Sequence, residues 1–163
     1  MALKEVMHAI QSIEMATQIR ESGLVYPVIM ATHLTGMAVF GGMVLMTDLR
    51  LLGLVMKSSP IVDVVGGLRI LKRIGAGLVI LCGILLGGSE ADKYYPNPYF
   101  WLKMAFLALI CVHALAFRPS VYGKLEEFDK AGVVPTNAKV AATLSLILWA
   151  GMVTFGRLIA YYD

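Results

Sequence analysis

The sequence predicts an all-α integral membrane protein, in which a four-helix bundle in the bilayer is preceded by an amphipathic helix at the membrane interface. Hydrophobic residues make up 58% of the 163 residues, charged residues make up only 15%, and the mean hydropathy is +0.75. Soluble domains carry about 25% charged residues, so this composition indicates a chain embedded in lipid. The net charge of +3 is too small to favour a nucleic-acid partner. We expect one transmembrane domain over residues 1–163.

The first element, residues 2–20, is expected to lie in the membrane interface without crossing the bilayer. Its apolar residues recur every three or four positions, which is the pattern of an amphipathic helix. Charges of both signs and the lack of an apolar core exclude a secretory signal peptide. The apolar stripe consists of Leu3, Val6, Ile10 and Ile13.

Four apolar runs are long enough to cross a bilayer, which requires about 20 residues. The first run has no charged residue between Glu21 and Asp48. The second contains Arg69, Lys72 and Arg73, which we expect to snorkel to the surface from its first turns. The predicted spans are 24–47, 66–88, 98–117 and 138–161.

Basic residues are distributed unevenly between the two ends of this predicted bundle. The connections 50–73 and 118–139 together carry nine Lys and Arg residues, and the opposite side carries five. Cytoplasmic loops carry an excess of Lys and Arg in membrane proteins. The distribution therefore favours cytoplasmic placement of both connections and external placement of both termini.

Two histidines, His33 and His113, lie inside predicted spans, where an ionisable side chain needs a partner and often marks a functional site. His33 lies nine residues beyond Leu24 and His113 ten residues beyond Lys103. At the helical rise both would then be about 14–15 Å deep. Counting the third span from Pro98 instead gives a mismatch of about 9 Å. Equal depth thus depends on where the third span begins.

Histidines at equal depth on two helices are typical axial ligands of haem b, and a bis-histidine cytochrome is the function we expect from the residues. Covalent attachment is excluded because the C-x-x-C-H motif is absent. Lys103 and Arg157 are expected to bind the two haem carboxylates. The residues expected to line the macrocycle are Gly36, Met37, Phe40, Phe106 and Ile110.

Other functions stay open on the same residues. Each histidine can serve instead as an interhelical hydrogen-bond residue in a structural subunit. The series that contains Met30 and Met37 permits a copper-handling role. A cytochrome would transfer electrons within or across the membrane with a quinone or a redox protein as its partner, and the glycine-rich helix faces leave room for a homo-oligomer.

Three segments, ATHLTGMAVFGGMVLMTDLRLLG, FWLKMAFLALICVHALAF and KVAATLSLILWAGMVTFGRLIAY, carry a resemblance over nearly the whole chain. They resemble a family of small uncharacterised bacterial four-helix membrane proteins. This resemblance implies a bacterial inner (cytoplasmic) membrane location. In that membrane, the charge distribution predicts that both termini are periplasmic. It implies no activity.

Two shorter resemblances concern individual residues. The chain resembles HemJ-type protoporphyrinogen oxidases, four-span haem proteins with a histidine in an early span and a lysine opening a later one, which His33 and Lys103 match. That resemblance implies oxidation of a porphyrin or a quinol, although Trp101 stands where the HemJ pattern has a second histidine. The motif H-x-x-G-x-x-x-x-G-G, which begins at His33, resembles copper-resistance proteins of the CopD type.

Overall fold

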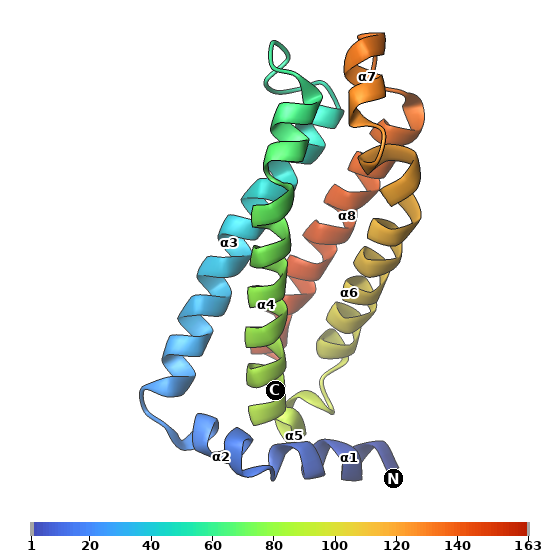
Figure 1. Ribbon diagram of the computed structural model, residues 1–163. Coiled ribbons are helices and arrows are strands. Elements are labelled where there is room, and N and C mark those ends of the chain that lie inside the picture. The colour runs from blue at the N-terminus through green and yellow to red at the C-terminus, as the bar shows by residue number, and fades with distance from the viewer. Residues whose placement is uncertain (1, 163) are drawn as a thin grey trace.

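The computed structural model describes residues 2–162, which are helical almost throughout and include no strand. Four long helices run alongside one another (Figure 1), and each, with its flanking turns, is long and apolar enough to cross a membrane. The all-α membrane bundle expected from the sequence is confirmed. The four helices are α3 (Val25–Leu51), α4 (Arg69–Ser89), α6 (Pro98–Phe117) and α8 (Thr136–Leu158).

The ends of these helices depend on polar contacts that hydropathy alone does not reveal. Helix α3 continues to Leu51, beyond the predicted end of the first span, because Arg50 is buried and donates to the Ser59 carbonyl at 2.6 and 3.2 Å. Gly53 then takes a left-handed φ of 74°. Turns extend three of the helices: η1 (Val62–Gly66) before α4, η2 (Arg118–Tyr122) after α6 and η3 (Ile159–Tyr161) after α8.

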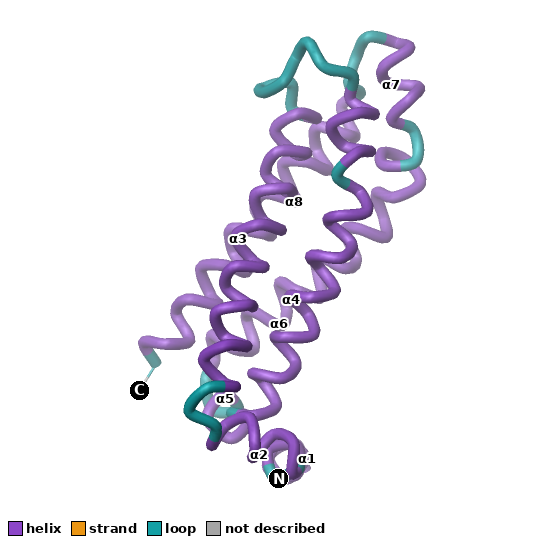
Figure 2. Tube along the Cα trace, turned by 60° about the vertical axis from the view of Figure 1, so that its left-hand side comes forward, coloured by secondary structure: helices purple, strands orange, loops and turns teal. Residues whose placement is uncertain are grey.

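Three short helices lie across the end of the bundle that holds both termini, here called the terminal end (Figures 1 and 2). They are α1 (Ala2–Gln11), α2 (Glu14–Glu21) and α5 (Ala91–Tyr94). The sequence predicted one helix over residues 2–20, whereas the chain breaks at Ser12 and Ile13. The apolar stripe of this segment remains exposed and is therefore free to contact lipid.

The opposite end, here called the loop end, contains the best-buried apolar core. Leu51, Val65, Val121 and Ala138 pack there with almost no exposed surface. The short helix α7 (Leu125–Ala131) covers this core. Its Asp129 accepts hydrogen bonds from the amides of residues 61 and 62 at 2.7 and 2.8 Å, which satisfies two amides at the start of the second span.

The four long helices form three packed seams and one open edge. Helix α3 packs on α4, α6 packs on α8, and α3 packs on α8. Among the described residues, α4 and α6 form no comparable interface, and α8 is visible behind the gap between them (Figure 1). We call this α4–α6 side of the bundle the open edge. The bundle therefore consists of two sequential hairpins, α3–α4 and α6–α8, joined along the α3–α8 seam.

Candidate functional site at His33 and Lys103

His33 lies in the third turn of α3 and is only 7% exposed. Its ring faces α4 at Gly83, where an added Cβ would lie 3.2 Å from the ring atom Cε1. The missing side chain at Gly83 is therefore what makes room for the imidazole. The backbone of Val79 also lies near the ring, yet the ring nitrogen Nδ1 has no hydrogen-bond partner. Buried polar atoms are normally satisfied, so this nitrogen is an exception among the described side chains.

Lys103 extends into the same part of the bundle from α6. Its side chain crosses Gly156 of α8, where an added Cβ would lie 3.6 Å from Cδ and 3.9 Å from Nζ. Its charge acts on the imidazole of His33. Within residues 2–162, no Asp or Glu forms a salt bridge with this lysine. A buried imidazole and a cation without a partner carboxylate thus share the interior of the bundle on the side of the terminal end.

His113 lies elsewhere, and the expectation that it shares a level with His33 is wrong. Helix α6 begins at Pro98, where the Asn97 side chain caps it by accepting from the Tyr99 amide at 3.0 Å. His113 is fifteen residues from that start and His33 eight residues from the start of α3, so their heights are about 22 and 12 Å. The Nε2 atom of His113 lies 2.9 Å from the Ala141 carbonyl of α8. This histidine therefore joins α6 to α8.

Most of the residues expected to line a haem between the two histidines instead pack the helix seams. Phe40 meets the ring of Trp149 edge-on at 5.3 Å in the α3–α8 seam. Phe106 packs over Gly151, and its ring lies 5.3 Å from that of Phe155. Gly36 faces Val79, whose Cγ2 would lie 3.1 Å from an added Cβ. The structure leaves Met37 and Ile110 half-buried.

Arg157 does not join Lys103 in the interior. Its side chain is exposed, donates to the Tyr161 hydroxyl at 3.0 Å and lies 5.1 Å from the centre of that ring. Of the two cations expected to bind carboxylates, only Lys103 extends into the bundle.

A metal site made of His, Cys, Asp and Glu side chains is absent from the described residues. Among residues 2–162, no three His, Cys, Asp or Glu side chains come close enough to hold one ion. Cys82 and Cys111 are both free, the first buried and the second exposed. Haem differs, because its iron needs only one or two protein ligands.

A second polar cluster, which the sequence did not predict, lies inside the bundle near the loop end. Asp48 is 1% exposed, and its Oδ2 atom has no hydrogen-bond partner. Lys72 donates to Thr47 Oγ1 at 3.2 Å. The Asp48 carboxyl interacts with the Ser145 side chain and with the charge of Lys72. The sequence predicts that Asp48 follows the end of the first span and that Lys72 snorkels to the surface, whereas the structure places both in the bundle. The available signal was the lack of any Gly or Pro between Asp48 and Gly53, which lets α3 continue past the carboxylate.

The four spans and the two buried polar clusters define the class: a small multi-pass membrane protein with ionisable groups inside its bundle. Within that class, the chain belongs to DUF6644, a family of unknown function that matches residues 17–162. No curated protein and no solved structure matches it. The expectation of a family without an assigned activity is confirmed, and the function has to be argued from the site.

Proposed function

We propose that the protein is a membrane-embedded redox protein that binds haem b at the His33–Lys103 site. The observation that carries the proposal is an imidazole buried in an apolar bundle with one ring nitrogen unpaired. Haem iron takes an imidazole as an axial ligand, and a buried, unpaired histidine is suited to that role. Haem carboxylates need cationic partners, which the unpaired ammonium of Lys103 would provide.

The open edge supports this proposal because it gives a flat apolar molecule a route from the lipid. Helices α4 and α6 do not pack against each other in the described chain, and these two helices carry Gly83 and Lys103. The missing side chains at Gly83 and Gly156 are what allow the imidazole and the lysine chain to lie against the backbones of α4 and α8. A macrocycle between α4 and α6 would approach the imidazole and the ammonium together.

Ligation by one histidine changes the function that the site supports best. His113 is committed to the Ala141 carbonyl in another seam, so the bis-histidine arrangement expected from the sequence does not fit one chain. One axial position would stay open, which suits chemistry on a bound molecule better than simple electron transfer. We therefore favour an oxidoreductase that acts on a porphyrin or a quinol, with a quinone or a redox protein as its electron partner.

The resemblance to HemJ-type oxidases, which no comparison supports, enters this proposal only through His33 and Lys103. At the position where those enzymes have a second histidine, Trp101 is 40% exposed and donates to the Tyr95 carbonyl at 2.9 Å. Any role of that second histidine is therefore missing here. A bacterial inner-membrane location belongs to the same proposal.

An absorption spectrum of the purified protein, produced with an adequate haem supply, tests the proposal. We expect a Soret peak and a ferrous α-band that disappear in His33→Ala and persist in His113→Ala, with His8→Ala as the surface control. Equal loss in the His33 and His113 variants would restore the bis-histidine site. A wild-type protein that binds no haem on reconstitution would remove the proposal, and copper in that colourless protein would favour the CopD-like alternative.

Lys103 has a separate test through haem affinity. Lys103→Met keeps the length of the side chain and removes the charge, so we expect haem binding to weaken about tenfold, as for the loss of one charge-assisted hydrogen bond. Lys103→Arg should retain most of the affinity. Lys93→Met removes an exposed lysine near the same end and is the matched control; an equal effect there would argue against a specific carboxylate partner.

A further inference from the structure

Helix α4 begins with a concentration of positive charge. Arg69, Lys72 and Arg73 all lie among its first five residues. Lys72 turns inward towards Thr47, whereas the two arginines are exposed. Within residues 2–162, neither arginine forms a salt bridge with Asp or Glu. This helix end therefore carries positive charge that the described part of the protein does not neutralise.

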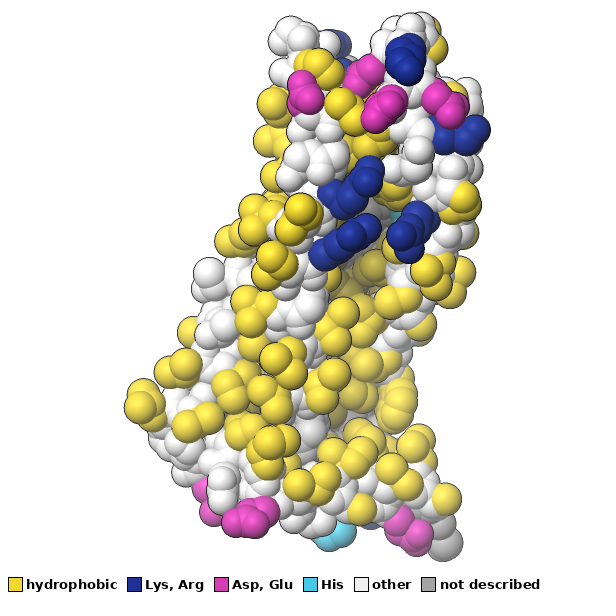
Figure 3. Space-filling view, viewed as in Figure 1, with side chains coloured by type: hydrophobic (Ala, Val, Ile, Leu, Met, Phe, Trp, Pro, Cys, Tyr) yellow, Lys and Arg dark blue, Asp and Glu magenta, His cyan; other side chains and the backbone are white. Residues whose placement is uncertain are grey.

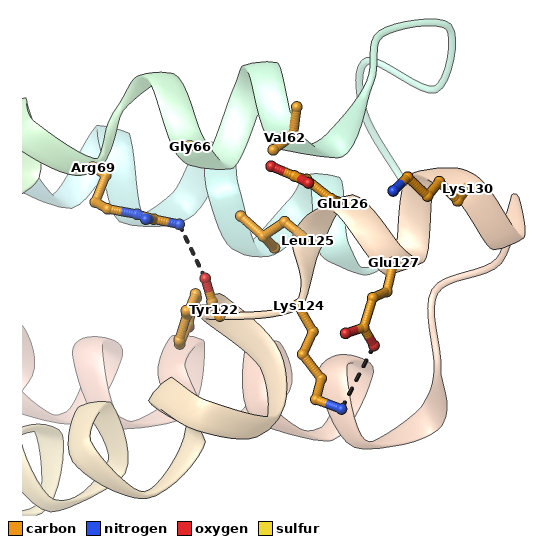
Figure 4. Close-up of a pocket in the computed structure, with 10 residues that line it drawn as sticks. Val62, Gly66, Arg69, Tyr122, Lys124, Leu125, Glu126, Glu127 and Lys130 are labelled. Atoms are coloured by element: carbon orange, nitrogen blue, oxygen red, sulfur yellow. Dashed lines mark hydrogen bonds and ion pairs between the residues drawn. The ribbon is translucent and has the colours of Figure 1, made fainter.

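More positive charge lies across the open edge. Arg118 begins η2 at the end of α6, is exposed and likewise forms no salt bridge with a described residue. Arg69 reaches towards the same turn and donates to the Tyr122 carbonyl at 3.0 Å (Figure 4). Lys and Arg side chains gather over the upper parts of α4 and α6 (Figure 3). The basic cluster thus spans the two helices that fail to pack.

Acidic side chains of the loop end lie on the other side of this cluster. A pocket of about 500 Å³ separates Arg69 from α7 (Figure 4). On the α7 side, Glu127 pairs with Lys124 at 3.5 Å, and Glu126 also lines the pocket. In Figure 3 several Lys and Arg side chains lie between the acidic side chains of this end and the apolar surface below, while other basic side chains lie level with the acidic ones. On this face, basic side chains are therefore the charged groups of the loop end nearest the apolar surface.

Apolar surface continues directly from the basic cluster towards the terminal end (Figure 3). Ile70 and Ile74 on α4 are 70% and 63% exposed, and Val112 and Leu115 on α6 are 61% and 69% exposed. The surface thus combines cations at one end with hydrocarbon along the helices. An anionic phospholipid has the complementary distribution, with a charged headgroup joined to two acyl chains.

We propose that the open edge binds an anionic phospholipid, with its phosphate between Arg69, Arg73 and Arg118 and its acyl chains along α4 and α6. Guanidinium groups bind phosphate through paired charge-assisted hydrogen bonds. Basic pockets between transmembrane helices bind such headgroups. The positive-inside rule alone accounts for basic loops, but it requires neither a cluster across two unpacked helices nor the absence of acidic partners. The lipid joins the helices where protein contacts do not.

The first test compares probes on the wild-type full-length protein in a zwitterionic detergent. Phosphatidylglycerol, phosphatidylcholine and inorganic phosphate are titrated separately, with native mass spectrometry to count bound lipids and thermal unfolding to detect stabilisation. We expect saturable binding and a raised melting temperature with phosphatidylglycerol alone. Equal binding of phosphatidylcholine overturns the proposal, and so does full competition by inorganic phosphate, which indicates a site for free anions.

A pair of charge-matched variants then locates the site. Removing three arginines of the open edge should weaken phosphatidylglycerol binding about tenfold or more, whereas removing three lysines elsewhere on the loop end should leave it unchanged. If both variants lose phosphatidylglycerol binding equally, the proposal is overturned, because the lipid is then attracted by the overall positive charge of the loop end. The lipid comparison on wild-type protein decides the question even if the arginine variant does not fold. The variants are Arg69→Gln/Arg73→Gln/Arg118→Gln and, as control, Lys57→Gln/Lys124→Gln/Lys130→Gln.

Discussion

Single glycines set how closely α8 approaches its neighbours. A Cβ at Gly41 would lie 2.6 Å from the Trp149 ring, and a Cβ at Gly151 would overlap the Phe106 ring. Real Cβ atoms cannot come this close, so a side chain at either position must displace an aromatic ring from its seam. Gly42, the next residue along α3, has no heavy atom within 4 Å of its hypothetical Cβ. Gly41 is therefore needed for packing against Trp149, whereas a side chain at Gly42 would affect only the conformational preference of the helix.

Gly41→Ala should destabilise the bundle by about 1–3 kcal/mol, because the added methyl group overpacks the α3–α8 seam. Gly42→Ala should be neutral or stabilising by up to about 1 kcal/mol, because alanine favours the helix and meets no neighbour. Unfolding of the two variants in mixed micelles measures the difference. Equal stability of both would mean that the Trp149 ring does not fill the space above Gly41.

His113→Ala tests the hydrogen bond between α6 and α8. Interhelical hydrogen bonds in membranes contribute about 0.6 kcal/mol on average, so we expect a loss of stability of that order with no change in the haem spectrum proposed above. The same unfolding assay measures it, with Cys111→Ala as a control at an exposed position two residues away. Greater stability of the His113 variant would contradict an interhelical role.

The sequence identified His33 and Lys103 because an ionisable residue within or beside a long apolar run is conspicuous whatever its rotation about the helix. It failed at His113 because equal depth depended on Lys103 as the interface marker, whereas α6 begins at Pro98, where the predicted span also begins. It failed at Asp48 because α3 continues past this carboxylate to Leu51, where Arg50 donates a hydrogen bond to the Ser59 carbonyl that hydropathy does not encode. A shift of a few residues in a boundary changes the inferred depth of a side chain by several ångströms.

At the scale of elements, the α1–α2 segment is attached to the bundle by the buried side chains of Ala16 and Ile19 and by several polar contacts. His8 Nδ1 lies 2.8 Å from the Asp92 carboxylate, and the Asp92 amide donates to Gln11 Oε1 at 2.8 Å. Arg20 donates to the Ser89 carbonyl at 3.3 Å. The apolar stripe of α1 remains exposed, so it is available to contact the membrane.

Asp92→Ala should loosen α1 without unfolding the bundle, because an exposed ion pair contributes only about 0–1 kcal/mol. We expect faster amide hydrogen exchange in residues 2–11 and unchanged exchange in α3 and α8. Glu5→Ala, at an exposed residue that forms no salt bridge within residues 2–162, is the control. Unchanged protection of α1 in the Asp92 variant would show that the His8–Asp92 ion pair does not hold it.

Hydropathy predicted the four long helices, because each long helix is apolar over most of its length. It did not predict the break between α1 and α2, or the π-helical turns η1 and η2. The break falls at Ser12 and Ile13, where the Ser12 hydroxyl bonds the Ala9 carbonyl at 2.8 Å. Here a side chain takes a carbonyl that a helical amide would otherwise use. Such a bond leaves the spacing of the apolar residues unchanged, so hydropathy cannot reveal it.

At the scale of the whole molecule, connections 50–73 and 118–139 lie at the same end, as a common membrane side requires (Figure 1). We predict that this loop end faces the cytoplasm, because it holds nine of the fourteen Lys and Arg residues. Cysteines introduced at Ser58 and Ser120, in a background without Cys82 and Cys111, should react with an impermeant thiol reagent only after the membrane is opened. Labelling of intact cells or spheroplasts would reverse the topology.

The sequence predicted an antiparallel bundle but not which side of it would stay open. That outcome depends on the glycines and aromatic rings that bring α8 against both α3 and α6. Among the described residues, no glycine of α4 or α6 receives an aromatic ring from the other helix. Hydropathy identifies membrane helices but carries little information about which faces of them meet.

The pairing of helices that are consecutive in the chain has a consequence for biosynthesis. The α3–α4 hairpin is complete before the ribosome has made α6, and helices that are inserted independently can associate as soon as both are in the bilayer. The α3–α8 seam then forms last, when synthesis is nearly finished. His33 comes from the first hairpin and Lys103 from the second, so the two side chains meet only after the halves dock. Any ligand that requires both would select fully synthesised chains and stabilise them against degradation.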